Sequence, residues 1–310
     1  MTSLVATILL AAALLSQTPP QTRPSTVASL WRDTPEDVSR VRIDLIPDIT
    51  EPSDLLMHQG AFYTISDSYR LIYQIDFYGV GGAIRHVGSW TPAGLPMQTD
   101  LEALASLPGG EVLVASETNG VIFVLNPFPR HACAAWKTGV EGSCFFGRPN
   151  CGIEAMAVVP GRRLFVAKER EPRAAYLFDL PDNPCAASSL TGRTYLEMPE
   201  EVGADISGAT FDAGSGHLLI IARSNQKVLE FEVPEPTPGD FSPRRLNLVG
   251  AFSYARTEDS LGYGGLLHHQ VEGIAVDERR VLYLTVDNNE RVSTRFASAR
   301  PPLLRFYPVN

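Results

Sequence analysis

The chain has 310 residues, of which 44% are hydrophobic and 20% are charged, so it has enough apolar material for a sizeable globular core. Its formal net charge of −9 and its lack of a Lys/Arg-rich run argue against nucleic acid as a partner. The sequence also contains no G-x-S-x-G, H-E-x-x-H, Walker or G-x-G-x-x-G motif, which disfavours the hydrolases, zinc proteases and nucleotide enzymes that use them.

The first predicted element is a short apolar run at residues 4–15, LVATILLAAALL. A membrane-spanning helix needs roughly 20 apolar residues, so this run predicts a secretory signal peptide over residues 1–16. Residues 17–39 begin with the Pro/Thr/Gln-rich stretch QTPPQTRPST and are predicted to be a disordered lead-in. No later segment is apolar enough to span a membrane. We therefore expect a periplasmic or extracellular protein without a transmembrane segment in its mature form.

From about residue 40 onwards the sequence repeats itself five times. The units open with PSDLLMHQ, DLEALASL, GIEAMAVV, DISGATFD and VEGIAVDE, and each continues with two further β-rich runs bounded by Gly, Pro, Asn or Asp. Repeats of this length built from short strands predict an all-β protein with a β-propeller fold over residues 40–310, as a single domain. Five four-stranded blades are the direct count. Six remain possible, because the last interval between units is 65 residues long.

Five outer strands are needed to complete the blades. Linking segments supply candidates at residues 83–90, 191–198 and 244–252, which read AIRHVGSW, TGRTYLEM and RRLNLVGAF. The segment RVRIDLIPDI at residues 40–49 precedes the first unit and belongs to no unit of its own. We predict that it is the outer strand of the last blade and closes the ring, because closure removes an exposed sheet edge.

Two aligned columns of the repeat carry polar side chains. The first column lies in the opening strand of each unit and holds Ser53, Glu102, Glu154, Ser207 and Glu272. The second column ends the next strand and is aligned as Asp67, Glu117, Glu169, Ser224 and Asp287. Because the first strands of propeller blades line the central channel, equivalent residues of successive blades are expected to converge there.

Seven carboxylates that converge on one axis repel one another by energies on the order of kcal/mol per pair. Protonation, Arg or Lys partners, or a bound cation would relieve this repulsion. Hard oxygen ligands without a His/Cys cluster suit Ca²⁺ best. The alternative is structural, since such carboxylates also bond backbone N–H groups of the neighbouring blade. The candidate metal ligands are Glu102, Glu154, Glu272, Asp67, Glu117, Glu169 and Asp287.

Other polar residues near these columns could contact a ligand. His268 and His269 precede Glu272 and could supply a general base or a metal ligand, although a solvated loop is the more common situation. Basic residues in AKEREPR and NNERVSTR could bind an anion, although surface pairing with nearby Glu is more common. The basic residues are Lys168, Arg170, Arg173, Arg291 and Arg295. Lys168 and His269, together with Ser53 and Ser207, form the candidate ligand-contacting set.

Four cysteines lie within 53 residues, at Cys133, Cys144, Cys151 and Cys185. Their spacing does not give the two close pairs of a zinc site, and an exported protein favours disulfides. Three pairings are possible. We favour Cys133–Cys144 and Cys151–Cys185.

The repeat motifs resemble those of the SdiA-regulated (YjiK-like) family of exported β-propellers. The resemblance rests on NCGIEAMAV at 150–158 with LFVAKEREPRAAYLFDL at 164–180, and on the segments at 100–125, 205–221 and 270–289. Related motifs occur in propellers with phytase-like esterase activity. The resemblance implies a propeller with acidic residues near its channel and with calcium. It brings no established reaction, and Ala103 and Ala155 stand where the family pattern often has Gly.

Three functions remain open at this point. The first is an exported propeller that binds Ca²⁺ and an unidentified small molecule or protein near its channel, without catalysis. The second is a Ca²⁺-dependent phosphoesterase or esterase in which a metal-bound water is the nucleophile. The third is a lactonase-like hydrolase that uses His269 as its base.

Overall fold

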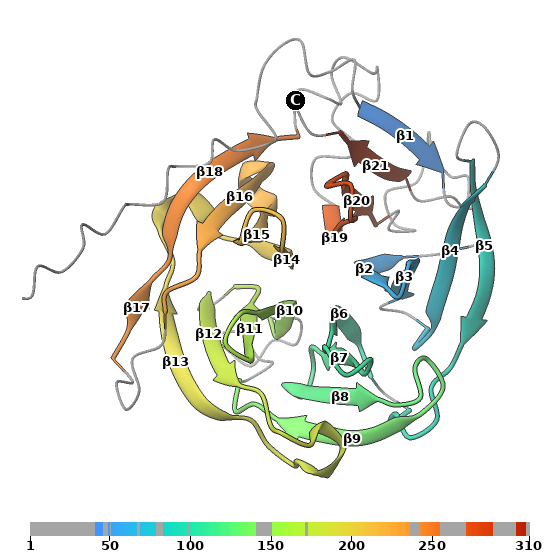
Figure 1. Cartoon of the computed structure of the whole chain (residues 1–310), viewed down its shortest axis with the longest axis horizontal. Coiled ribbons are helices and arrows are strands. Elements are labelled where there is room, and N and C mark those ends of the chain that lie inside the picture. Colours follow the sequence, from blue (N-terminus) through green and yellow to red (C-terminus); the bar gives the residue numbers. More distant parts are fainter. Residues whose placement is uncertain are drawn as a thin grey trace, which may run out of the picture.

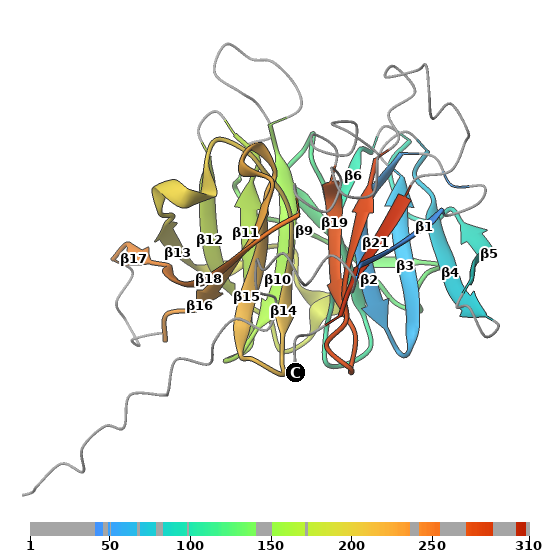
Figure 2. The ribbon, with the colours of Figure 1, turned by 90° about the horizontal axis from the view of Figure 1, so that it is seen from above.

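The computed structural model of the chain shows five β-sheets arranged as a ring around a central axis (Figure 1). Seen from the side, the inner strands run along this axis (Figure 2). The structure describes residues 41–45, 49, 51–66, 69–78, 83–97, 99–140, 151–170, 173–235, 242–254, 271–287 and 302–307. Each sheet is one blade, so the predicted all-β fold with five blades is confirmed.

The first four blades follow the chain from the axis outwards. Blade 1 contains β2 (Pro52–His58), β3 (Ala61–Ser66), β4 (Ile72–Tyr78) and β5 (Ala83–Trp90). Blade 2 contains β6 (Leu101–Ser106), β7 (Val112–Ser116), β8 (Val121–Leu125) and β9 (Ala132–Lys137). Blade 3 contains β10 (Ile153–Val159), β11 (Arg163–Lys168), β12 (Ala174–Asp179) and β13 (Thr191–Glu197). Blade 4 contains β14 (Ile206–Asp212), β15 (His217–Ala222), β16 (Lys227–Glu232) and β18 (Asn247–Ser253).

The predicted outer strand at residues 244–252 is divided between two blades. Its first two residues form β17 (Arg244–Arg245), which pairs in parallel with β13 and extends blade 3. The remainder belongs to β18 and completes blade 4. In the described part of the chain, three short 3-10 helices, η3 (Pro184–Ala186), η4 (Glu200–Val202) and η5 (Arg223–Asn225), lie in the connections.

Blade 5 joins the two ends of the propeller. It contains β19 (Val271–Val276), β20 (Leu282–Val286), β21 (Pro302–Phe306) and, as its outer strand, β1 (Val41–Leu45). β1 runs antiparallel to β21, with Val41 opposite Phe306 and Leu45 opposite Pro302 (Figure 1). The prediction of an N-terminal closing strand is therefore confirmed.

The hydrophobic core is divided among the spaces between neighbouring blades. Each of the five buried clusters draws its side chains from two adjacent blades, and together they complete the circle. Phe165 of blade 3 and Phe231 of blade 4, for example, share one cluster and are fully buried. Burying such a side chain contributes roughly 1.5–3 kcal/mol. The apolar side chains buried between neighbouring blades therefore hold the ring together.

The innermost strands approach closely at the residue that follows the first polar column. A Cβ atom on Gly273 would lie 2.5 Å from the backbone of Asp54, and one on Gly208 would lie 2.5 Å from the carbonyl oxygen of Glu272. Ala103 and Ala155 occupy the same position in the blades where the approach permits a methyl group. Backbone proximity thus explains why this position carries small residues in four of the five units.

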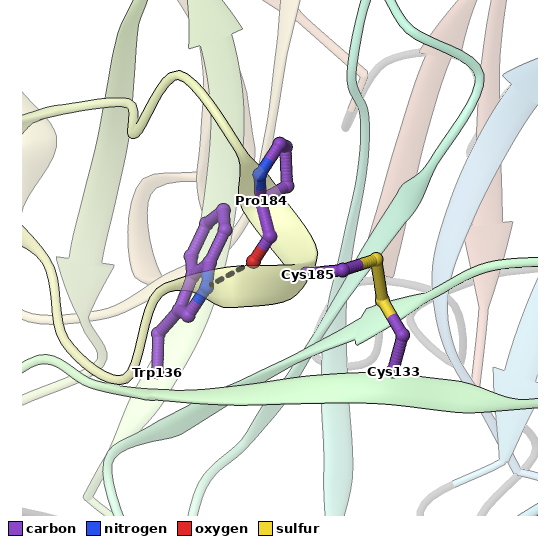
Figure 3. The surroundings of a disulfide bond; sticks show 4 residues. All are labelled: Cys133, Trp136, Pro184 and Cys185. Carbon is purple, nitrogen blue, oxygen red and sulfur yellow. Dashed lines mark hydrogen bonds between the residues drawn. A yellow bond between two sulfur atoms is a disulfide. The ribbon is translucent and has the colours of Figure 1, made fainter.

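The disulfide pattern differs from the favoured one. Cys133 on β9 is bonded to Cys185 in η3, with their Cα atoms 5.2 Å apart (Figure 3). The neighbouring Trp136 donates its indole N–H to the carbonyl oxygen of Pro184 at 2.9 Å. The pairings Cys133–Cys144 and Cys151–Cys185 are therefore wrong. Cys151 is also disulfide-bonded, and its partner lies outside the described residues.

The physical reason for this pairing is the packing of blades 2 and 3. The outer strand of blade 2 runs beside the β12–β13 connection of blade 3, as the bridge between Lys137 and Ser189 also shows. A sulfur atom on β9 is therefore closer to that connection than the chain order suggests. Within the described residues, no helix has the length and apolar character needed to cross a membrane.

Candidate cation site at the channel mouth

The first polar column lies on a β-bulge in every blade. The pairing between the two inner strands skips one residue in each case, and the skipped residue is the column member. A bulge locally re-aims a side chain and leaves it outside the regular ladder, which is why bulges are common next to functional sites. The five skipped residues are Ser53, Glu102, Glu154, Ser207 and Glu272.

The second polar column needs a correction in blade 4. The backbone N–H groups of Glu117 and Glu169 donate to the carbonyl oxygens of Asp100 and Gly152, at 3.1 and 3.0 Å. The equivalent bond in blade 4, from the residue directly after β15, is made by Arg223 to Asp205 at 3.1 Å. Arg223, not Ser224, therefore occupies this column. The column places a cationic side chain among carboxylates.

Two groups of carboxylates meet on the side of the ring formed by blades 2 and 3. Glu117, Glu154 and Glu169 are buried and each offers an oxygen, with these oxygens within 4.8 Å of one another. Asp100 and Glu102 form a second such group with Glu117, which belongs to both. At this separation two ionised carboxylates repel each other by about 3.5 kcal/mol for an effective dielectric constant of about 20.

Arg223 neutralises the carboxylates that meet where blades 3, 4 and 5 adjoin. Its Nε and Nη2 donate to the two oxygens of Asp205, both at 3.0 Å. Nη1 donates to Glu272 of blade 5, and Nη2 also donates to Glu169 of blade 3. The guanidinium group thus joins carboxylates from three blades. Arg170 adds a second cation on Glu169, with its Nη2 3.0 Å from Oε1.

Burial raises the pKa of the acidic residues at this site. The pKa of Glu154 lies well above its ordinary value, first because the carboxyl is buried and then because Glu169, Glu117 and Glu272 repel its charge. Burial likewise raises the pKa of Glu169 to about 8, against the lowering effect of Arg223. The pKa of Glu272 rises to about 7 for the same first cause. Burial and mutual repulsion thus favour the protonated form of these carboxyl groups.

Two buried carboxylates show how a structural acid differs from the acids of this cluster. Asp54, fully buried between blades 1 and 2, accepts the backbone N–H groups of Leu55 at 2.7 Å and Leu104 at 2.5 Å. Its Oδ2 therefore connects blade 1 to blade 2, while its Oδ1 bonds the backbone of its own strand. Glu169 is also buried, but its Oε2 has no hydrogen-bond partner among the described residues. A buried oxygen without a partner is costly unless something else binds it.

Glu117 combines both roles. Its Oε1 accepts the backbone N–H of Gly152 at 3.2 Å, which ties blade 2 to blade 3 as the structural alternative expects. The same carboxylate belongs to both acidic groups. A register bond to the neighbouring blade and a place in the acidic cluster are thus compatible in one side chain.

The remaining predicted site residues divide into three kinds. Ser207 donates its hydroxyl to the carbonyl oxygen of Val271 at 2.6 Å and so serves the contact between blades 4 and 5. Ser53 and Lys168 are buried, and the charge of Asp287 repels that of Glu272. Several others lie outside the described residues, namely Asp67, His268, His269, Arg291 and Arg295.

Sequence reasoning missed three residues of this site, namely Asp100, Asp205 and Arg223. Asp100 and Asp205 each stand two residues before the first polar column, so they form a third column that the aligned repeats already contained. Arg223 was missed because the fourth unit was aligned one residue out of register. Aligning the repeats by the end of the second strand, and not by acidic residues alone, would have placed Arg223 in this column.

Comparisons with known proteins agree with this fold. The glutaminyl cyclase of Myxococcus xanthus matches with a TM-score of 0.54 and 15% identity, over 87% of this chain and 96% of that one. A luciferin-regenerating enzyme matches with a TM-score of 0.50 and 10% identity, over 87% of this chain and 96% of that one. At such identities these likenesses show the fold alone. The SdiA-regulated family matches residues 93–290, more than half of the chain, so this protein belongs to the SdiA-regulated family.

Proposed function

We propose that this protein is an exported propeller that binds Ca²⁺ at its channel mouth and presents it to a small ligand or protein partner, without catalysis of its own. The observation that carries the proposal is the buried group of Glu117, Glu154 and Glu169, whose oxygens lie within 4.8 Å of one another. Such a group is costly without a positive charge between its members.

The chemistry of the donors favours Ca²⁺ among divalent cations. Every residue of the two acidic groups offers a carboxylate oxygen. Ca²⁺ accepts six to eight oxygen ligands in irregular arrangements, whereas Mg²⁺ demands a near-octahedral set at shorter distances. The acidic groups come from the bulges and loop ends of different blades, an arrangement that suits the more tolerant ion.

Two features support export. The apolar run at residues 4–15 has the length of a signal-peptide core. The Cys133–Cys185 disulfide is typical of proteins that fold in an oxidising compartment. N-terminal sequencing of protein from the exported fraction should find a mature start between residues 14 and 24, and an intact Met1 on cytoplasmic protein would contradict export.

A metal-dependent esterase or phosphoesterase is the second candidate. Arg170 favours it, because this side chain is half-exposed and its Nη2 lies 3.0 Å from the buried Glu169. A cation at the site together with an exposed guanidinium group could hold an anionic ester, and the cation would activate a water. A screen with phosphate and carboxylate esters, with and without Ca²⁺, distinguishes this candidate from a non-catalytic protein.

The test of the main proposal is a melting experiment on metal-free protein. Millimolar Ca²⁺ should raise the melting temperature more than Mg²⁺ does, since a ligand at a hundred times its Kd stabilises by about 2.7 kcal/mol. Glu154→Gln should remove most of this response. Glu230→Gln is the matched control, because Glu230 is also a buried glutamate but bonds His217 at 3.3 Å within blade 4. Identical melting of the unaltered protein with chelator and with Ca²⁺ would refute the proposal.

A further inference from the structure

Arg223 holds a position in the ring that other blades give to a carboxylate. Its backbone bond to Asp205 matches the bonds of Glu117 to Asp100 and of Glu169 to Gly152. Asp287 holds the same column in blade 5, directly after β20. One blade thus presents a fixed positive charge at a point where its neighbours present negative charges.

The contacts of Arg223 are those that a bound cation would make. Its guanidinium group is bonded to Asp205, Glu169 and Glu272, which belong to blades 4, 3 and 5. Its side chain is only 14% exposed, and all three of its nitrogens donate to carboxylates. Three carboxylates around one buried positive charge are equal in number to the neighbouring group of Glu117, Glu154 and Glu169.

Glu169 connects the acidic group of Glu117 and Glu154 with the carboxylates that surround Arg223. Its Oε1 faces Arg223 and Arg170, while its Oε2 is buried without a hydrogen-bond partner in the described part of the chain. Carboxylates that bind metals are commonly held in place by hydrogen bonds to one oxygen, and loss of such an outer partner weakens metal binding. The two arginines thus hold Oε1 and leave Oε2 for a cation.

We propose that Arg223 is a built-in counter-ion that fills a second cation position of the ring and positions Glu169 for the first. The inference rests on the proposed cation site and adds to it a residue that sets the number of cations bound. With Arg223 in place, the cation is confined to the side of the ring made by blades 2 and 3. Without its charge, Glu169, Asp205 and Glu272 become a new set of oxygen ligands.

The test is calorimetric titration of the metal-free full-length mature protein with CaCl₂, and elemental analysis after dialysis. Arg223→Gln should bind one more Ca²⁺ per chain than the unaltered protein. Arg223→Lys should bind the same number with a Kd about 10-fold weaker, because an ammonium group cannot hold three carboxylates in the same arrangement. Arg280→Gln is the matched control, since Arg280 also joins blades 4 and 5, through Asp212 at 2.8 Å, at the far ends of β14 and β19.

The outcomes separate this inference from the proposed function. If the unaltered protein and Arg280→Gln bind Ca²⁺ and Arg223→Gln binds the same number with the same affinity, the inference is wrong and the proposed function stands. If the unaltered protein binds none and Arg223→Gln binds one, the counter-ion role holds and the proposed function fails. Should Arg223→Gln not fold in chelator, it is purified in CaCl₂ and its bound calcium is counted. An unchanged Kd for Arg223→Lys would overturn the positioning role.

Discussion

At the scale of single residues, the acidic cluster opposes folding in the absence of a cation. Glu154 is repelled by Glu169, Glu117 and Glu272, and burial raises its pKa further. Removing the charge of Glu154 should therefore remove this repulsion and stabilise the metal-free protein. We predict that Glu154→Gln increases the free energy of unfolding of the metal-free protein at pH 8 by on the order of 1 kcal/mol.

Urea unfolding of Glu154→Gln in the presence of chelator measures this effect. Glu230→Gln should show no such increase, because the Glu230 carboxylate lies 3.3 Å from the imidazole Nδ1 of His217. A metal-free Glu154→Gln protein that is less stable than the unaltered protein at pH 8 would show that repulsion does not dominate at this residue.

The pH dependence of stability follows from the same residues. The pKa values of Glu169 and Glu272 are raised in the folded state to about 8 and about 7. A group with a raised folded-state pKa stabilises the protein fully below its unfolded pKa, near 4.5, and this stabilisation is lost as the pH rises through the folded value. We predict that the metal-free protein loses on the order of a few kcal/mol between pH 5 and pH 8.

Melting temperatures of chelator-treated protein across this pH range test the prediction. Saturating Ca²⁺ should flatten the profile, because a cation makes the ionised carboxylates favourable. A metal-free protein whose melting temperature rises steadily from pH 5 to pH 8 would contradict the assignment of raised pKa values to this cluster.

At the scale of elements, β1 completes the last blade. It contributes a five-residue antiparallel ladder to β21, which would otherwise be an exposed edge strand. We predict that deletion of residues 40–49 unfolds or aggregates the protein, whereas deletion of residues 17–26 leaves the melting temperature unchanged. Equal melting temperatures for the two truncated proteins would show that ring closure by β1 contributes little to stability.

The Cys133–Cys185 disulfide joins two blades across a sequence separation of 52 residues. A loop of this length implies a stabilisation of about 4 kcal/mol through the entropy of the unfolded chain. We predict that the double variant Cys133→Ser/Cys185→Ser loses stability of about this size in urea unfolding while it keeps its β-sheet circular dichroism. A loss of less than about 1 kcal/mol would mean that the packing of Trp136 against η3 already fixes this junction.

At the scale of the whole molecule, the sequence predicts the propeller well because each blade is a local unit. Apolar runs separated by turn residues identify the strands, and the orphan segment before the first unit identifies the closing strand β1. The disulfide pairing depends on how blade 2 packs on blade 3, and this contact is not visible in the spacing of Cys133 and Cys185. Arg223 was missed for a related reason, because only the backbone bond to Asp205 fixes its column.

The acidic site is likewise a property of the whole ring. Glu117 and Glu169 come from neighbouring blades, and Glu272 is brought to them through Arg223. The first column could be aligned from the sequence because each member lies on the same bulge. Which members meet one another could not be predicted, because that depends on the positions of five blades around the axis.

Calcium binding at the channel mouth can be observed directly in an anomalous-difference map from crystals of the mature protein grown with CaCl₂. We predict a peak with oxygen ligands at about 2.3–2.6 Å that include carboxylate oxygens of Glu117, Glu154 and Glu169, between blades 2 and 3. A map at saturating Ca²⁺ that shows these three carboxylates without a bound ion would contradict Ca²⁺ binding by this cluster.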